Sequence, residues 1–348
     1  MTARPITRRH AVQAASAAAA LGLLPARAQS PKVMPASELL ARAPHVALSN
    51  GIVTATLYPP GAGAFYRGTR FDHAGVIGSL KLKGQEFYGP WFDAVREDVA
   101  DFRWIDGKVA AGRASSTMGP AEEFDPVGFD KAGPGGIFLI PGVGLVTRPD
   151  TQPYNHFRHY EPTVRMLNSR YLKSDGNSAQ MRHVVAGAGY SYDYTKTIAL
   201  TPGRPEMVIT HLLRNDGELP IVTSVYDHNF VTLNSGQADM QVTLPFAPAP
   251  PAPQTRLKAD GNTIRWPQAL EEGQSGYAIL SETPQPYDFT VTDTRTGASV
   301  RAQCERRASQ YKLWSIRTVM AVEPYIALNV PPGGGEQRWT YTYTYSVA

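Results

Sequence analysis

The sequence predicts an all-β protein in which residues 29–348 form a single domain with few short helices. Three observations support this prediction. Apolar and polar residues alternate in short runs along most of the chain, which is the pattern of half-buried strands. Clusters of Gly, Pro and Asn separate these runs as turns. Finally, residues 339–345 read Trp-Thr-Tyr-Thr-Tyr-Thr-Tyr, so one face of the last strand is aromatic and must be covered by other elements.

The elements can be placed in chain order from these patterns. A turn at Pro59-Pro60-Gly61 ends the first run and Lys83-Gly84 ends the second, while Asn215-Asp216-Gly217 joins two later runs. A hairpin about Thr296-Gly297 places apolar residues on one face. The predicted strands and hairpins cover residues 51–58, 76–82, 190–200, 207–214 with 221–225, 287–304 and 339–345.

Three segments interrupt the alternation. Residues 118–136 are rich in Gly, Pro and acidic residues and are predicted to be a long loop, as is the segment 155–160. Long loops on a β scaffold often carry functional residues. The proline-rich segment 246–253 is predicted to be a surface crossover within one domain, because strand-like sequence lies on both sides; an interdomain linker is the alternative.

Residues 1–28 are predicted to be an export signal peptide. Arg8-Arg9 precede an alanine-rich apolar run at residues 14–24, and Ala26-Arg27-Ala28 offers the small residues that signal peptidase prefers. The paired arginines resemble a twin-arginine signal, although the bulky apolar residue usual after them is missing. We expect a periplasmic or secreted protein with no stable membrane insertion after cleavage. A membrane anchor is the alternative, but the run is shorter than the ~20 residues of a spanning helix.

Charge and cysteine content exclude several classes of function. The whole chain has 34 basic and 30 acidic residues, but the predicted signal peptide contains four arginines and no acid, so the remainder is formally neutral. A neutral chain without a basic stripe gives no support for nucleic-acid binding. Cys304 is the only cysteine, so neither an intramolecular disulfide nor a cysteine zinc cluster can form. We expect no metal and no cofactor.

The stretch at residues 226–230, Tyr-Asp-His-Asn-Phe, holds the main candidate site. It places an imidazole, a carboxylate, an amide and two aromatic rings within five residues, a combination suited to binding a sugar. His228 lies on or just past the end of a predicted strand, and Glu323 supplies an isolated carboxylate, so the two are candidate catalytic residues for proton transfer. A structural histidine and a strand-edge carboxylate are the alternatives. Tyr226, Asp227 and Asn229 are candidate substrate contacts; the alternatives for Asp227 are that it orients His228 or caps a turn.

Three further residues are candidate sugar-binding contacts. Arg70 carries a fixed fork of donors that suits vicinal hydroxyls or a uronate carboxylate; pairing with Asp72 or Glu86 is the structural alternative. His156 lies in a predicted loop three residues before His159, a spacing that also suits metal ligands, although no acidic cluster accompanies them. Trp91 either stacks on a sugar face or packs in the core.

Several motifs resemble the galactose mutarotase-like (aldose 1-epimerase-like) superfamily. The opening is similar in its strand, glycine and Ser-Leu pattern, the middle in a turn followed by a strand with a histidine, and the close in a glutamate-bearing strand, a Pro-Gly turn and an aromatic strand. The sequences that carry this resemblance are Asn50-Gly51-Ile52, residues 74–80, Asn215-Asp216-Gly217, Asp227-His228-Asn229-Phe230, Glu323-Pro324-Tyr325, residues 330–334 and Trp339-Thr340-Tyr341. Asp227 before the histidine and Asn229-Phe230 after it depart from the family pattern.

The resemblance implies a β-supersandwich that binds a sugar on its concave face, with His228 as the acid and Glu323 as the base of anomer interconversion. No cofactor is implied. The superfamily also contains polysaccharide lyases and noncatalytic sugar-binding modules, and both remain open. In a lyase, Tyr226 or His228 would abstract a proton next to a uronate carboxyl, and Arg70 or Asn229 would neutralise the enediolate.

This interpretation makes a geometric prediction. His228 and Glu323 should project from neighbouring strands into one cleft, with Arg70 and His156 on its walls. If the two catalytic groups flank a sugar ring, their functional atoms should lie on the order of 5–9 Å apart, as paired groups do in glycoside chemistry.

Overall fold

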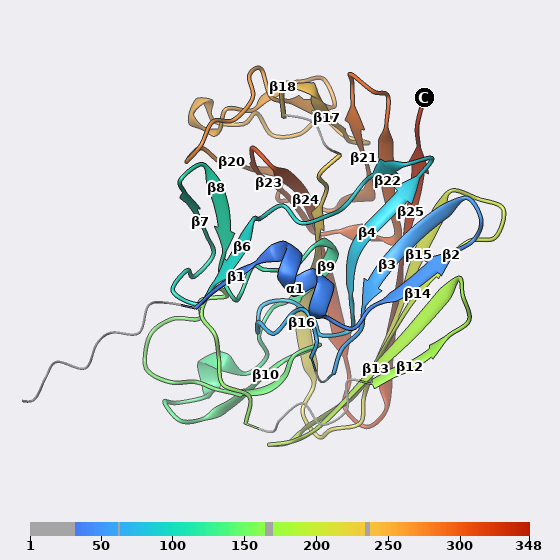
Figure 1. Ribbon diagram of the computed structural model, residues 1–348. Helices are drawn as coiled ribbons and strands as arrows, with labels where there is room; N and C mark the ends of the chain where they lie inside the picture. The colour runs from blue at the N-terminus through green and yellow to red at the C-terminus, as the bar shows by residue number, and fades with distance from the viewer. Residues whose placement is uncertain (1–31, 62, 164–169, 234–236) are drawn as a thin grey trace, which may run out of the picture. The chain divides into compact units, whose positions relative to one another are not determined.

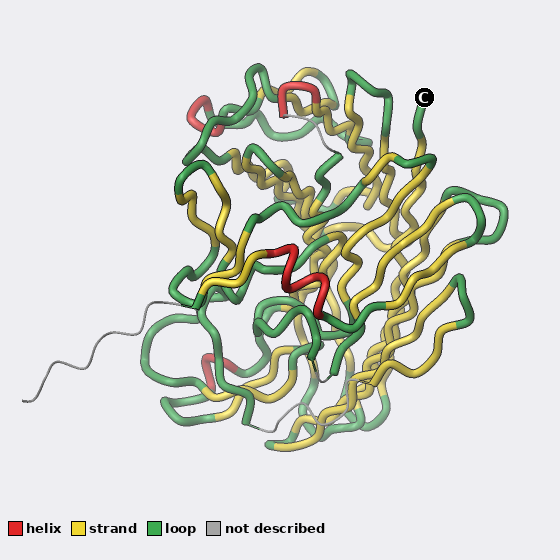
Figure 2. The backbone as a smooth tube through the Cα atoms, in the orientation of Figure 1, coloured by secondary structure: helices red, strands yellow, loops and turns green. Residues whose placement is uncertain are grey.

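The computed structural model describes residues 32–61, 63–163, 170–233 and 237–348. The predicted signal peptide lies outside these residues. Strands dominate the described chain (Figure 2), and its helical segments are α1 (Ala36–Arg42), η1 (Phe129–Lys131), η2 (Gln237–Asp239) and η3 (Pro253–Thr255). None of the helices in this part of the chain is long and apolar enough to cross a membrane. The prediction of an all-β fold with few short helices is confirmed.

The largest sheet has ten strands and contains the aromatic C-terminal strand near its middle (Figure 1). Neighbouring strands in it are antiparallel throughout. Its strands, in spatial order, are β12 (Arg170–Ser174), β13 (Ser178–Gly187), β14 (Tyr190–Leu200), β15 (Glu206–Asn215), β25 (Gly335–Ser346), β22 (Ser299–Ala308), β21 (Gln285–Asp293), β17 (Met240–Thr243), β19 (Thr263–Arg265) and β18 (Lys258–Asp260).

A second antiparallel sheet of five strands carries the predicted catalytic residues. Its strands, in spatial order, are β20 (Gly276–Ser281), β23 (Gln310–Ile316), β24 (Val319–Val330), β16 (Ile221–Phe230) and β9 (Gly119–Phe124).

Three smaller sheets complete the fold. They consist of β2 (Val46–Ser49), β3 (Val53–Tyr58), β4 (Val76–Leu82) and β5 (Gln85–Glu86); of β1 (Val33–Pro35), β6 (Ala94–Arg96), β8 (Lys108–Ala111) and β7 (Phe102–Ile105); and of β10 (Ile137–Ile140) with β11 (Gly144–Thr147).

One face of the ten-stranded sheet packs against one face of the five-stranded sheet, and the main hydrophobic core lies between them. Trp339, Tyr341, Tyr343 and Tyr345 of β25 are all buried in this core, which confirms that the aromatic face of the last strand is covered. The opposite face of the five-stranded sheet borders a second core cluster that includes Phe71, Trp91 and Phe230. The five-stranded sheet therefore has one face sealed against the ten-stranded sheet and one face that borders the second core cluster.

Most predicted strands are found where the alternation placed them. The ranges 76–82 and 190–200 coincide with β4 and β14, and the hairpin at 287–304 corresponds to β21 and β22, with Phe289 opposite Ala302 and Val291 opposite Val300. The segment 246–253 connects β17 and β18, two strands of the same sheet.

The prediction of a long loop over residues 118–136 is wrong in its first part. Residues 119–124 form β9, an edge strand in which every residue is buried. An edge strand tolerates Pro120 because one side of it needs no ladder donor. Glu122 and Glu123 can be buried because basic side chains pair with them on the two faces of the strand. The composition of the segment gives no indication of these partners.

Candidate active site

A cavity of about 260 Å³ lies on the face of the five-stranded sheet that is turned away from the ten-stranded sheet. Strands β16, β23, β24 and β20 supply much of its lining, and loops supply the rest. Its lining residues are Arg70, Trp91, Asp101, Ser115, His156, Phe157, Tyr226, His228, Phe230, Tyr277, Lys312, Trp314, Glu323 and Tyr325. The volume is slightly below the ~300–1,000 Å³ of cavities that hold drug-sized ligands, which suits a compact ligand such as one sugar ring.

The alternation of β16 sorts the candidate stretch into two sets. Tyr226, His228 and Phe230 line the cavity. Asp227 and Asn229 point the other way, where both accept hydrogen bonds from the Tyr343 hydroxyl of β25. Asp227 and Asn229 were predicted to bind substrate; instead they are buried between the two sheets. Adjacent residues of a strand point to opposite faces, so a five-residue stretch cannot deliver all its side chains to one cavity.

His228 and Glu323 come from neighbouring antiparallel strands. The β16–β24 ladder runs as far as Tyr226 opposite Tyr325, and the same register continued by two residues places His228 opposite Glu323. Nε2 of His228 lies 3.3 Å from Oε1 of Glu323, and both side chains are almost completely buried. The predicted separation of 5–9 Å is therefore wrong. The two groups touch each other on the floor of the cavity rather than flanking a space wide enough for a ring.

Burial sets the protonation of this pair. It lowers the pKa of His228 well below the usual value, and the positive charge of Arg70 lowers it further. Burial raises the pKa of Glu323 to about 7, although Arg70 opposes the shift. His228 is therefore uncharged at neutral pH, while Glu323 gains its proton as the pH falls through about 7. This order is the reverse of the one that solution pKa values suggest.

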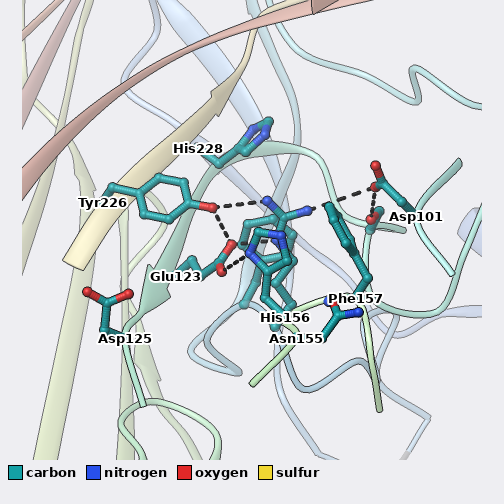
Figure 3. A network of polar contacts seen from close by, with 12 residues as sticks. Asp101, Glu123, Asp125, Asn155, His156, Phe157, Tyr226 and His228 are labelled. Carbon is teal, nitrogen blue, oxygen red and sulfur yellow. Dashed lines mark hydrogen bonds and ion pairs between the residues drawn. The ribbon is translucent and has the colours of Figure 1, made fainter. Parts of the chain in front are cut away.

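Glu123 of β9 is the hub of the polar contacts beside this pair. Figure 3 shows Tyr226 and His156 converging on its carboxylate, with His228 close by. The Tyr226 hydroxyl donates a hydrogen bond to Glu123, the Arg70 guanidinium donates one to the same oxygen, and His156 Nδ1 lies 2.7 Å from the other oxygen. Burial disfavours ionised Glu123, but the charge of Arg70 and these hydrogen bonds outweigh it and lower its pKa to about 2. Glu123 is therefore a permanent anion that holds three side chains in place.

Arg70 lines the cavity as predicted, but its guanidinium already forms an ion pair with Glu123. Besides Glu123 it contacts the Tyr226 hydroxyl at 3.0 Å and Asp101 at 3.9 Å. The alternatives considered from the sequence, Asp72 and Glu86, are not its partners. Residues 65–73 form a loop with one isolated bridge, and the loop turns Asp72 toward Lys196 and Tyr194 instead.

Trp91 forms a wall of the cavity and is also a core residue. Its ring stacks on Phe230, with centroids 5.6 Å apart, and its Nε1 donates to the backbone oxygen of Thr117. Only 2% of Trp91 is exposed, so little of its face is available for stacking on a sugar.

The sequence did not single out several cavity residues. Glu123 was hidden in a segment of loop-like composition. Lys312 and Trp314 alternate on β23 and face the cavity, and Tyr325 follows Glu323 by two residues on β24. The period-two pattern places Tyr325 on the same face as Glu323, so this residue could have been found from the sequence.

A second cavity of about 640 Å³ adjoins the first. Four residues line both: His156, Tyr226, Lys312 and Tyr325. Glu123 and Asp125 belong to the lining of the outer cavity. The acid–base pair therefore lies at the inner end of a longer depression whose outer part is more open.

A second group of titratable side chains lies behind the sheet and is sealed. Lys196 of β14 contacts Glu122 of β9 and Asp72, and His211 Nε2 lies 2.7 Å from Glu122. Burial opposes ionisation of Glu122, but Lys196 and His211 lower its pKa to about 2, whereas burial raises the pKa of Asp72 to about 7. Asp227 belongs to this inter-sheet cluster. Burial, and then the charge of Glu122, raise its pKa well above the usual value.

The described residues contain no group of three or more His, Cys, Asp or Glu side chains placed to hold a metal ion. His159, considered with His156 as a possible ligand, does not line either of the two cavities.

Comparison with known proteins identifies the class of fold. No family model matches the chain, and no curated protein matches it. Among solved structures, a protein from Synechocystis sp. aligns over 88% of this chain and 97% of its own, with 12% identity and a TM-score of 0.52. A galactose mutarotase-like protein from Lactobacillus casei aligns over 87% of this chain and 100% of its own, with 12% identity and a TM-score of 0.50.

The chain therefore has the galactose mutarotase-like fold, as its motifs predicted. At 12% identity the likeness extends to the fold alone, and the activity has to be argued from the cavity.

Proposed function

We propose that this protein is an exported, carbohydrate-active isomerase similar to aldose 1-epimerase, which interconverts sugar anomers through His228 and Glu323. The observation that carries the proposal is the contact between these two side chains on the floor of a small cavity. The pKa of His228 is lowered and that of Glu323 is raised to about 7, so their usual order is reversed. Residue pairs with strongly perturbed pKa values in a cavity are typical of proton-transfer sites. The name of the Lactobacillus casei neighbour supports the same class.

The short contact suits this reaction. Opening a pyranose removes the proton of the anomeric hydroxyl and protonates the ring oxygen, and both oxygens are bonded to the same carbon. A donor and an acceptor 3.3 Å apart can therefore reach both oxygens from one side within hydrogen-bonding distance. A glycosidase needs a wider spacing because a water molecule or a covalent bond must fit beside the ring. No such space is needed here.

One proton shared by the pair is sufficient for ring opening. Below pH about 7 Glu323 is protonated and His228 is neutral. We propose that Glu323 donates to the ring oxygen while His228 accepts the proton of the anomeric hydroxyl. The aldehyde carbon then turns, and the ring closes on its other face as the protons return. The sequence assigned the acid to His228 and the base to Glu323; the pKa order favours the opposite resting assignment, and the pair titrates as a unit.

Polarimetry tests this proposal. Pure protein should accelerate the change in optical rotation of fresh α-glucose or α-galactose above the buffer rate. Each of His228→Ala and Glu323→Gln should lower the accelerated rate by ~10²–10⁴-fold. The double variant should lose little more than the worse single variant, because the two residues act as one unit. Lys258→Met, an exposed lysine on β18 outside both cavities, is the matched control. If a panel of free aldoses relaxes at the buffer rate, or if His228→Ala keeps full activity, the proposal fails.

The two other functions considered from the sequence make different predictions. A binding protein would bind a sugar without altering its rotation, and Arg70→Ala or Trp91→Ala would weaken binding more than Glu323→Gln. A lyase would release unsaturated ends that absorb in the ultraviolet from a uronate polysaccharide. The lyase is less favoured because Arg70 is already paired and Asn229 faces away from the cavity, so both predicted neutralising groups are occupied.

Export is proposed from the N-terminal sequence alone. N-terminal sequencing of the protein recovered from the periplasm or medium should begin after Ala28. Recovery of uncleaved chain in the membrane fraction would favour the anchor instead.

A further inference from the structure

Lys312 lies where the inner and outer cavities meet. It extends from β23, lines both cavities, and is half-buried. Its register partner across the ladder is Glu323, so its backbone lies beside the acid–base pair. The lysine therefore brings a positive charge to the edge of the site in which a sugar ring would bind.

The other charged groups that line the two cavities each have a partner. Glu123 is paired with Arg70, Asp101 accepts a hydrogen bond from Ser115, and Asp125 accepts one from Ser224. Glu323 contacts His228 and is charged only in part near neutral pH, since burial raises its pKa to about 7.

Lys312 has no such partner. Across the residues that the structure describes, no carboxylate oxygen lies within 4.0 Å of its Nζ, and the remaining segments of the sequence contain neither Asp nor Glu. Among the described residues it is the one cation of this lining with no carboxylate within ion-pairing distance, although its charge still acts on Glu323 from farther away. A half-buried ammonium is less screened than a surface lysine, so an anion that meets it is held more strongly.

The position of the ammonium group is fixed by one aromatic residue. Nζ of Lys312 donates to the Tyr325 hydroxyl at 3.1 Å and lies 4.3 Å from the centre of the same ring. An ammonium has three donors, so two remain for a ligand. Tyr325 in turn stacks on Tyr226, with ring centroids 4.4 Å apart. The charge is thus held in place beside the cavity before any ligand arrives.

We propose that Lys312 binds an anionic substituent of the sugar, so that the preferred ligand is an acidic sugar bearing a carboxylate or a phosphate rather than a neutral aldose. This inference rests on the proposed sugar-binding role of the inner cavity. The ring occupies the inner cavity above His228 and Glu323, and the substituent extends toward the outer cavity and meets Lys312. Asp125 is exposed at the outer cavity and limits the anion to the junction.

Calorimetry with matched pairs of ligands tests the inference. The pairs are glucose with glucuronate, galactose with galacturonate, and glucose with glucose 6-phosphate, so that the arms separate a carboxylate from a phosphate. In the wild-type protein at least one acidic member should bind on the order of 10- to 100-fold more tightly than its neutral parent, as expected for hydrogen bonds to a charged group. Lys312→Met should bring that ratio close to one, and Lys258→Met should leave it unchanged.

Three results would overturn the inference: equal affinity for acidic and neutral members in the wild-type protein, a preference that survives in Lys312→Met, or absence of binding by every ligand. Polarimetry on the same pairs keeps the two proposals apart. If neutral aldoses are turned over and acids are not preferred, the isomerase proposal holds and the anion site is excluded. If Lys312 is needed for binding an acidic sugar whose rotation does not change, the anion site holds and the isomerase proposal fails.

Lys312 has a second possible role, in setting the charge of Glu323, because it lowers the pKa of that residue. Loss of that effect alone would change the affinity for neutral and acidic sugars equally, and it would shift the pH profile of the rate for both. A fall confined to the acidic member of each pair is the result that only anion binding predicts.

Discussion

Each face of the five-stranded sheet borders a group of buried titratable residues that includes one lysine. The two lysines differ in whether a carboxylate pairs with them. On the sealed face, Lys196 contacts two carboxylates, Glu122 and Asp72. On the cavity face, the one polar contact that the described residues give the Lys312 ammonium is the Tyr325 hydroxyl. The clusters are separated by no more than the strands themselves, because Glu122 and Glu123 are consecutive residues of β9 that point to opposite faces. The paired Lys196 therefore stabilises the fold, whereas the proposed role of Lys312 is to pair with an anion of the ligand.

The same contrast applies to the histidines. His211 on the sealed face has both ring nitrogens near acceptors, one on Glu122 and one on the backbone oxygen of Trp339. His228 on the cavity face touches Glu323 through Nε2, while its Nδ1 has no hydrogen-bond partner within the described residues. Buried polar atoms normally find partners, so the sealed face satisfies both nitrogens of its histidine and the cavity face does not.

The largest expected effect separates the two lysines by stability. Lys196→Met removes the cation from the sealed face and leaves Glu122 and Asp72 without their main partner. Breaking a buried ion pair in this way typically costs ~3–5 kcal/mol. Lys312→Met should cost about 1 kcal/mol, the value of one hydrogen bond. Chemical denaturation of both variants measures the difference. Equal losses would contradict the division into a structural and a functional face.

The next effect concerns the pH dependence of stability. The folded protein raises the pKa of Glu323 from 4.5 to about 7, so between these values the folded state binds more protons than the unfolded state. Stability therefore falls as the pH rises through this window, by roughly 3 kcal/mol in total for this group. Glu323→Gln removes its share of the slope. Denaturation at pH 4.5 and pH 8 should show Glu323→Gln gaining stability relative to wild type at the higher pH. A difference that does not vary with pH would show that Glu323 is not destabilised by burial.

The fold could be predicted from the sequence because period-two alternation is a local signal. The aromatic β25 and the exact extent of β4 and β14 follow from it. The motifs around His228 and Glu323 led to the fold and to the pair, because the glutamate-bearing strand and the histidine-bearing strand are neighbours in the sheet.

The rest of the site depends on contacts that no local pattern contains. Glu123 could not be recognised in a segment with the composition of a loop, since its burial depends on Arg70, which lies far away in sequence. Asp227 and Asn229 were misplaced for a different reason: proximity in sequence was taken for proximity in the cavity, whereas a strand turns alternate residues away. The separation of 5–9 Å predicted for His228 and Glu323 is that of paired groups in glycoside chemistry, whereas the two side chains are in direct contact.

A smaller effect is expected in the pH profile of activity. The proposed active form carries one proton on the pair, and burial raises the pKa of Glu323 to about 7 while it lowers that of His228. The rate should therefore fall about tenfold per pH unit above pH about 7, and it should also fall at low pH once His228 gains a proton. Polarimetry from pH 5 to 9 measures this. A rate that rises through pH 7 would instead identify ionised Glu323 as the base and neutral His228 as the donor.

The smallest effect is expected at Asp227, one residue from the proposed acid–base pair. Burial raises its pKa well above the usual value, which favours the uncharged carboxyl that Asp227→Asn mimics in charge and in shape. The amide oxygen can still accept the hydrogen bond from Tyr343, so stability should change by less than about 1 kcal/mol. KM and kcat should stay within about twofold of wild type, far from the ~10²–10⁴-fold loss expected for His228→Ala. A marked rise in KM would mean that Asp227 contacts the sugar after all, and that the sheet does not keep the two faces apart when substrate binds.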